Sequence, residues 1–136
     1  MPAEASGYRF ERVMLIDDND IDNLINSRII TSHNFAAKVD VKTATETALE
    51  HLRSLTPDSS NVPSIIFLDL NMPGLDGFAF LEEFEKLADF IKTGCKVVVL
   101  SSSISPDDIN KASTNAYVIK YINKPLSESY LDAINF

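Results

Sequence analysis

Five short apolar runs recur along the chain, each separated from the next by a more polar segment. They lie at residues 13–16, 36–41, 64–68, 95–100 and 117–122. Short apolar runs that are bounded by turn residues are typical of buried β-strands. The segments between them carry apolar residues at helical spacing, and strands that alternate with helices predict a parallel sheet covered by helices on both faces.

The segments between the runs predict the helices. Apolar residues recur three or four positions apart in four of them: Ile21, Leu24, Ile25 and Ile29; Ala44, Ala48, Leu49 and Leu52; Phe78, Leu81, Phe84, Ala88 and Ile91 on a longer helix; and Ile109, Ala112 and Ala116. Ser105 is the expected N-cap of the fourth helix, with Pro106 in its first turn. Residues 126–134 predict a short fifth helix. Five such units suit an α/β, doubly wound, flavodoxin-like fold with a five-stranded parallel sheet in the order 2-1-3-4-5.

The length of 136 residues indicates one domain with a sizeable core. We expect residues 1–11 to form an N-terminal extension and residues 12–136 to form the domain. Residues 56–63, rich in Pro, Ser, Asn and Asp, predict a loop inside it. The net charge of −8 argues against direct contact with nucleic acid, because phosphate contacts need clustered Lys and Arg.

Neither a membrane segment nor a secretion signal is expected. No apolar run approaches the roughly 20 residues that span a bilayer, and the first ten residues lack a basic segment followed by an apolar one. Cys95, the single cysteine, opens an apolar run and is expected to be a buried small hydrophobe. A lone cysteine fits a reducing compartment, so we expect a cytoplasmic protein.

Polar side chains follow four of the predicted strands. Asp17 and Asp18 follow the first, Asp69 the third, Ser101 the fourth and Lys124 the fifth. In a parallel sheet these ends lie at the same edge, which is where ligands bind in open α/β folds. Three carboxylates so close together repel one another unless a cation lies between them. Mg²⁺ suits such a site, because it takes oxygen ligands and keeps several waters for a phosphate-bearing partner.

These side chains indicate phosphoryl transfer. A carboxylate beside Mg²⁺ and a lysine can attack phosphorus and form an acyl phosphate. The metal and Lys124 would neutralise charge on the transferring oxygens, and Ser101 would donate a hydrogen bond to one of them.

The chain resembles the receiver domains of two-component response regulators, and the resemblance covers residues 12–135. It is carried by the Asp17-Asp18 pair, by the Asp-Leu-Asn-Met-Pro-Gly-Leu-Asp-Gly segment at 69–77, by Ser101 after its apolar strand, and by Tyr-Ile-Asn-Lys-Pro at 121–125. Each motif is modest alone, whereas their order and spacing together are highly specific. The domain at residues 12–136 is therefore expected to be a receiver.

The resemblance implies a role for each acidic residue. Asp69 is the expected phosphoryl acceptor and belongs to the metal site. Asp18 would bind Mg²⁺ directly, and Asp17 mainly through water. Asn71 stands at the position whose backbone carbonyl completes the metal shell.

The resemblance also implies a switch. Ser101 is expected to follow the phosphoryl group, Lys124 to bind it, and Tyr121 to turn inward when Ser101 moves. The peptide bond between Lys124 and Pro125 is usually cis in this family. These movements would alter the surface formed by the fourth helix, the fifth strand and the fifth helix.

The partners implied by the resemblance are proteins. The phosphodonor would be a histidine kinase or a histidine phosphotransfer protein, and the altered surface would control a downstream effector protein or form a phosphorylation-dependent homodimer. Such a domain is not an enzyme in the usual sense, because it catalyses only its own phosphorylation and dephosphorylation. Little of the chain follows the fifth helix, so we expect a stand-alone receiver or a fragment of a longer regulator.

Other interpretations use the first acidic cluster differently. Asp17, Asp18 and Asp20 could simply cap the first helix. A phosphatase of the haloacid dehalogenase type would make Asp18 the nucleophile, but the chain is short for that fold and Asp69 would have no role.

Two binding modules and one non-phosphorylated receiver complete the alternatives. A calcium EF-hand loop that starts at Asp18 would need Gly and Glu where Asn23 and Ile29 stand, so it fails. An FMN module should carry a phosphate loop rich in Ser, Thr and Gly, unlike the acidic residues 17–20. The serious competitor is a receiver that serves as a constitutive docking module and is never phosphorylated.

Overall fold

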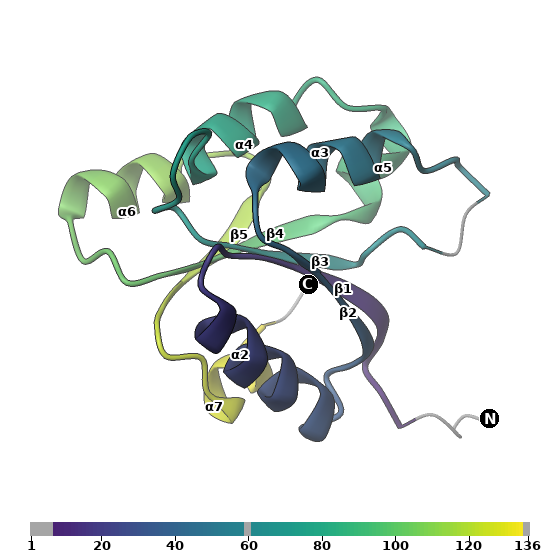
Figure 1. Cartoon of the computed structure of the whole chain (residues 1–136), viewed down its shortest axis with the longest axis vertical. Coiled ribbons are helices and arrows are strands. Elements are labelled where there is room, and N and C mark those ends of the chain that lie inside the picture. The colour runs from purple at the N-terminus through teal and green to yellow at the C-terminus, as the bar shows by residue number, and fades with distance from the viewer. Residues whose placement is uncertain (1–6, 59–60, 135–136) are drawn as a thin grey trace.

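Five strands lie side by side in one parallel sheet, in the order β2-β1-β3-β4-β5 (Figure 1). Their bounds are β1 Phe10–Ile16, β2 Ala36–Lys42, β3 Ile65–Leu68, β4 Lys96–Ser101 and β5 Val118–Asn123. The computed structural model describes residues 7–58 and 61–134. The sheet confirms the predicted doubly wound fold and its strand order.

Helices cover both faces of this sheet. They are α2 Asp20–Ser32, α3 Thr45–Arg53, α4 Gly77–Phe84, α5 Asp89–Gly94, α6 Pro106–Ser113 and α7 Glu128–Asp132. The two helices α2 and α7 lie on one face, and α3, α4, α5 and α6 lie on the other (Figure 1). Within the described ranges, no helix is long and apolar enough to cross a bilayer.

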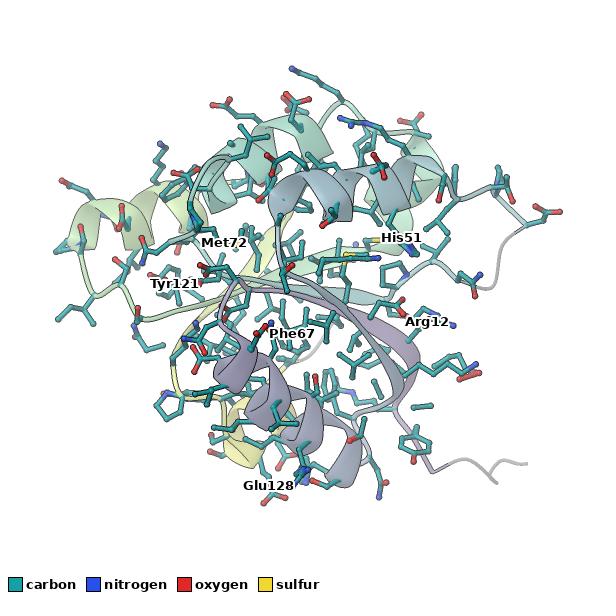
Figure 2. All side chains as sticks on the ribbon, viewed as in Figure 1. Arg12, His51, Phe67, Met72, Tyr121 and Glu128 are labelled. Carbon is teal, nitrogen blue, oxygen red and sulfur yellow. The ribbon has the colours of Figure 1, made fainter. Side chains whose placement is uncertain are left out.

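The sheet is apolar on both faces, as a parallel sheet between two helical layers requires. In β1, Val13 and Leu15 pack with residues of α2 and α7, whereas Met14 and Ile16 pack with residues of α3, α4 and α5. All four residues of β3 are buried, and Figure 2 shows Phe67 on the side of the sheet that faces α2. Continuous burial explains why β3 and the later parts of β1 and β4 are unbroken apolar runs in the sequence.

The ends of the chain and the long loop depart slightly from expectation. Strand β1 begins at Phe10, where it pairs with Ala36 of β2, although residues 1–11 were expected to form an extension. Residues 1–6 of that extension, residues 59–60 of the predicted loop, and residues 135–136 lie outside the described residues. The rest of the loop at 56–63 contains neither helix nor strand, as predicted.

Two local predictions are confirmed, one about the start of a helix and one about the buried cysteine. The side chain of Ser105 caps α6 and Pro106 lies in its first turn. Cys95 is buried directly before β4, and burial raises the pKa of its thiol to about 12. The fifth helix is shorter than predicted, because Ser127 caps it from within the predicted range.

Helix α2 turns a different face to the sheet from the one that its apolar stripe predicts. Ile21, Leu24 and Ile25 are 69%, 61% and 48% exposed. The buried face carries Asn23, whose side-chain Nδ2 donates a hydrogen bond to the backbone carbonyl of Asp17 at 2.8 Å. The predicted helix is confirmed, and this polar contact fixes its rotation so that these three apolar side chains face solvent.

The single long helix predicted from Phe78 to Ile91 is also wrong, because the chain forms two helices that are separated at residues 85–88. Ala88 has an extended backbone and is the N-cap of α5. Leu87 is buried whereas Ala88 is exposed. Burying the larger side chain stabilises the fold more, and a continuous helix would have buried Ala88 instead.

Candidate functional site

The carboxyl ends of four strands bring the predicted site residues to one edge of the sheet. Asp17 follows β1, Asp69 follows β3, Ser101 ends β4 and Lys124 follows β5. Asp17, Asp69 and Ser101 are only 1%, 5% and 0% exposed. The backbone N–H of Asp69 donates to the carbonyl of Ile16 at 3.0 Å, which places the two aspartates on adjacent strand ends.

The ammonium of Lys124 lies among three carboxylates. Its Nζ donates to Asp17 Oδ2 at 2.6 Å, to Asp22 Oδ2 at 2.9 Å and to Asp69 Oδ2 at 3.4 Å. Burial alone would lower the pKa of Lys124. The hydrogen bonds to Asp17 and Asp22 and the charges of Asp69 and Asp17 outweigh that effect, so the pKa is raised and the side chain is charged at neutral pH.

The backbone around Lys124 is fixed as well. Its N–H donates to the carbonyl of Ser101 at 2.9 Å, which joins the ends of β4 and β5. The bond between Lys124 and Pro125 is cis, which confirms the expectation from the resemblance.

Asp69 is held in an environment that disfavours its charge. Burial raises the pKa of its carboxyl, and the negative charge of Asp17 raises it further. Two groups oppose this rise: the N–H of Asn71, which donates to Asp69 Oδ1 at 3.2 Å, and the charge of Lys124. A buried carboxylate of this kind is more basic than an exposed one, and additional positive charge would keep it ionised.

Asp17, Asp18 and Asp69 form a group that suits a hard divalent cation. Each offers a carboxylate oxygen, and these oxygens lie within 4.8 Å of one another. Asp18 is exposed while the other two are buried, so the group opens to solvent on one side. One ammonium leaves this group with excess negative charge, and an oxygen-binding cation such as Mg²⁺ would neutralise it.

The turn after Asp69 needs glycine at two positions. A Cβ on Gly77 would lie 2.7 Å from both the carbonyl oxygen of Asp69 and the Cα of Leu70, which is too close for any larger residue. Gly74 has a φ of +74°, in the left-handed region that glycine adopts without strain. Asp76 then caps α4 through its side chain.

Two side chains of β5 hold the loop that follows β4. The hydroxyl of Tyr121 and Nδ2 of Asn123 each donate to the carbonyl of Ser103 at 2.9 Å. The N–H of Ser103 donates to Oγ of Ser101 at 3.2 Å, so a short path of hydrogen bonds links Ser101 to Tyr121. Figure 2 shows Tyr121 toward one end of the sheet and Arg12 toward the other.

The N-cap of α2 is not one of the three aspartates Asp17, Asp18 and Asp20. Asn19 is the N-cap, and its side chain accepts a hydrogen bond from the N–H of Asp22 at 2.9 Å. Asp17 instead accepts from the N–H of Asn19 through its own side chain. The alternative in which Asp17, Asp18 and Asp20 only cap this helix is therefore not supported at the N-cap position, although Asp20 lies in the first turn.

Sequence reasoning missed two side chains of this edge. Asp22 reaches Lys124 from the first turn of α2. Its place there depends on the rotation of that helix, for which the sequence carries no local pattern. Asn123 binds the loop after β4, and its contact depends on the path of that loop, for which the sequence carries no local pattern.

The fold and the site define an α/β domain with a doubly wound parallel sheet whose carboxyl edge carries an acidic cluster, a serine and a lysine. The model of the response regulator receiver domain family matches residues 13–134. The chain therefore belongs to the receiver domain family of two-component systems, which confirms the resemblance found in its sequence. This membership favours the receiver over the phosphatase, calcium-loop and FMN alternatives.

Two curated relatives share the domain. The probable methanogenesis regulatory protein FilR2 of Methanothrix harundinacea is 29% identical over 115 residues, which are 85% of this chain and 72% of that protein. Protein-glutamate methylesterase/protein-glutamine glutaminase 5 of Myxococcus xanthus is 30% identical over 114 residues, which are 84% of this chain but 30% of that protein. The matched region is thus a minor part of the Myxococcus enzyme.

Solved structures show the same fold over nearly the whole chain. A two-component response regulator from Cytophaga hutchinsonii has a TM-score of 0.82 at 34% identity, with 90% of this chain and 91% of that chain covered. A response regulator receiver protein from Dyadobacter fermentans has a TM-score of 0.80 at 26% identity, with 89% and 91% covered.

Proposed function

We propose that this chain is a phosphorylatable receiver that accepts a phosphoryl group on Asp69 from a histidine kinase or a histidine phosphotransfer protein. The proposal rests on two observations. Carboxylate oxygens of Asp17, Asp18 and Asp69 lie within 4.8 Å of one another, and the ammonium of Lys124 lies beside them. The family supports it, because receiver domains are the phosphoacceptors of two-component systems.

Asp69 supplies the attacking oxygen in this proposal. An oxygen of its carboxylate forms a bond to phosphorus while the bond from phosphorus to the donor nitrogen breaks, and the electron pair stays with the leaving histidine. Lys124 would bind an oxygen of the transferring group, and Ser101 would donate a hydrogen bond to another.

Asp17, Asp18 and Asp69, together with the backbone carbonyl of Asn71, would hold Mg²⁺. When bound, the ion would offset the negative charge of the carboxylates and of the phosphoryl oxygens. We expect Asp18 to be the direct ligand and Asp17 to act mainly through water. The domain would then catalyse only its own phosphorylation and dephosphorylation.

The signal would leave the site through Ser101 and Tyr121. A phosphoryl group that draws Ser101 toward it would disturb the hydrogen bond from Ser103 and, through Ser103, the bond from Tyr121. This would change the surface of α6, β5 and α7, which are the fourth helix, fifth strand and fifth helix of the prediction. A downstream effector protein or a second copy of the chain would read that change.

The exposed apolar face of α2 suits the phosphodonor. Ile21, Leu24 and Ile25 lie on the helix that begins three residues after Asp17 and carries Asp22 toward Lys124. Apolar residues grouped at the surface beside a polar site mark an interaction surface. A histidine-bearing protein that covers this face would bring its phosphoryl group to Asp69.

Asp69→Asn tests the proposal, because the amide keeps the shape of the side chain and removes the nucleophile. Both proteins are incubated with Mg²⁺ and acetyl phosphate or phosphoramidate, and the intact mass is recorded. We expect one added phosphoryl group in the wild type and none in the variant.

Two results would contradict this. Equal labelling of the Asp69→Asn variant would place the acceptor elsewhere. No labelling of either protein, with Mg²⁺ binding shown in a separate titration, would favour a docking module that is never phosphorylated.

A further inference from the structure

Lys124 has three N–H donors, and each is directed at a different carboxylate. Two of these carboxylates, Asp17 and Asp69, belong to the group that suits a metal ion, and the third, Asp22, does not. Asp22 is therefore an additional anion in contact with the lysine, and the phosphoryl acceptor is the most distant of the three, at 3.4 Å against 2.9 Å for Asp22.

Asp22 differs from the other two partners in its surroundings. Its side chain is 38% exposed, whereas that of Asp17 is 1% exposed. It lies in the first turn of α2, at the edge of a hollow of about 340 Å³ that also borders Ile25, Ser102 and Pro125. Asp22 thus holds Lys124 through an ion pair that is partly open to solvent. The pair comes from α2, whereas Asp17 and Asp69 follow strands.

We propose that Asp22 restrains Lys124 and thereby slows the phosphorylation of Asp69 by small phosphodonors. This rests on the proposed function, in which Lys124 binds an oxygen of the transferring group. A phosphoryl group needs positive charge to balance the charge on its oxygens, and an ammonium that is already paired with Asp22 offers less of it. Asp22 also adds to the negative charge that repels an anionic donor.

The reaction itself is unchanged by this restraint. With acetyl phosphate, an oxygen of Asp69 bonds to phosphorus, the bond from phosphorus to the acetate oxygen breaks, and acetate leaves with the electron pair. Asp22 touches neither reacting atom, so it is a residue that acts through Lys124. Asp22 therefore changes the rate at which Asp69 is labelled, but not which residue accepts the phosphoryl group.

Asp22→Asn is the test variant, because the amide has the same size and can still accept a hydrogen bond from Lys124 without pairing its charge. We expect this variant to be labelled by acetyl phosphate about two- to fivefold faster than the wild type, the size of effect that a partly exposed ion pair gives. Initial rates are measured from the intact mass in the presence of Mg²⁺. Increasing salt should narrow the difference, since screening weakens the pair.

Two further variants separate the restraint from a general charge effect. Asp20→Asn removes the same charge from the same exposed turn, and Lys124 donates to Asp17, Asp22 and Asp69 and not to Asp20 in the described part of the chain. Its rate should stay within about 1.5-fold of the wild type. Asp22→Glu keeps the charge and should be labelled no faster than the wild type.

An Asp22→Asn rate no higher than that of Asp20→Asn, or an equal gain in Asp22→Glu, would overturn the restraint while leaving Asp69 as the acceptor. A wild type and an Asp22→Asn variant that both remain unlabelled would instead overturn the proposed function. Thermal unfolding of each variant, followed by circular dichroism, shows whether a change in rate reflects a loss of folded protein.

Discussion

Gly77 is a single residue on which the position of Asp69, the proposed phosphoacceptor, depends. Its α-carbon lies against the backbone of Asp69 and Leu70, and its N–H donates to the carbonyl of Leu70 at 3.1 Å. A side chain here would collide with backbone, which cannot move away as a flexible side chain can. The turn that presents Asp69 and the start of α4 therefore need glycine at this position.

We expect Gly77→Ala to lower the free energy of unfolding by about 1–3 kcal/mol, the usual range for inserting a methyl group into tightly packed atoms. Urea denaturation followed by circular dichroism measures this. Gly94→Ala is the matched control, because its Cβ would meet only a side-chain carbon of Val62 at 3.4 Å. That control should change the stability by less than about 1 kcal/mol, and an equal loss in both variants would contradict the argument.

At the same scale, the sequence predicts the residues of the site that directly follow strands. Asp17, Asp69, Ser101 and Lys124 are recognised because an apolar run leads into a polar residue and parallel strands share an edge. Asp22 is not recognised in this way, because its part in the site depends on the rotation of α2. That rotation is set by tertiary contacts that a one-dimensional pattern does not contain.

At the scale of the element, α2 shows how a polar contact can override an apolar stripe. Asn23 binds the backbone of Asp17, and this directs Ile30 into the core while Leu24 faces solvent. The helix alternates apolar and polar residues closely enough that two rotations would each bury some apolar side chains. The sequence predicts that a helix lies here, but only the contact with Asp17, which follows β1, decides which face is buried.

This rotation is testable by a pair of alanine substitutions. We expect Leu24→Ala to lower the free energy of unfolding by less than about 1 kcal/mol, because the side chain is 61% exposed. Ile30→Ala should cost about 2–5 kcal/mol, because that side chain is fully buried. Chemical denaturation of both variants measures the difference, and the opposite ranking would support the face predicted from the stripe.

The break between α4 and α5 has a similar origin. Helical spacing places Phe84, Ala88 and Ile91 on one stripe, and the sequence offers no glycine or proline that would signal a break. The structure ends α4 at Phe84 and restarts the helix after Ala88, so that Leu87 reaches the core. The break allows the larger side chain of Leu87 to be buried, and helical periodicity alone does not indicate it.

On the scale of the whole molecule, α2 and α7 are joined by a histidine between two acids. Nδ1 of His33 lies 2.7 Å from Oε2 of Glu128, and its Nε2 lies 2.9 Å from Oδ1 of Asp132. The hydrogen bond to Asp132 is the main cause that raises the pKa of His33; burial opposes it, and the charges of Asp132 and Glu128 add to the rise. The contact connects segments that are far apart in the sequence.

The pH dependence of stability should reveal this contact. Because the pKa of His33 is higher in the folded chain than its unfolded value of about 6.5, the stabilisation is fully present below that value and is lost as the pH rises through the folded pKa. We expect the difference in unfolding free energy between the wild type and His33→Gln to be largest below about pH 6 and to decline above it.

Asp132→Asn serves as the control for this measurement. Removing the main partner should reduce the same pH dependence while leaving His33 in place. A difference between wild type and His33→Gln that does not vary with pH would show that the ring acts by packing alone.

The assembly of the site from four strand ends has a consequence for the life of the protein in a cell. Asp17 is synthesised early and Lys124 late, and the two meet only when the whole sheet has formed. A truncated, nascent or unfolded copy without the complete sheet therefore lacks the ammonium beside its carboxylates, and under the proposed function it would not accept a phosphoryl group. Only complete, folded molecules would then contribute to the signal.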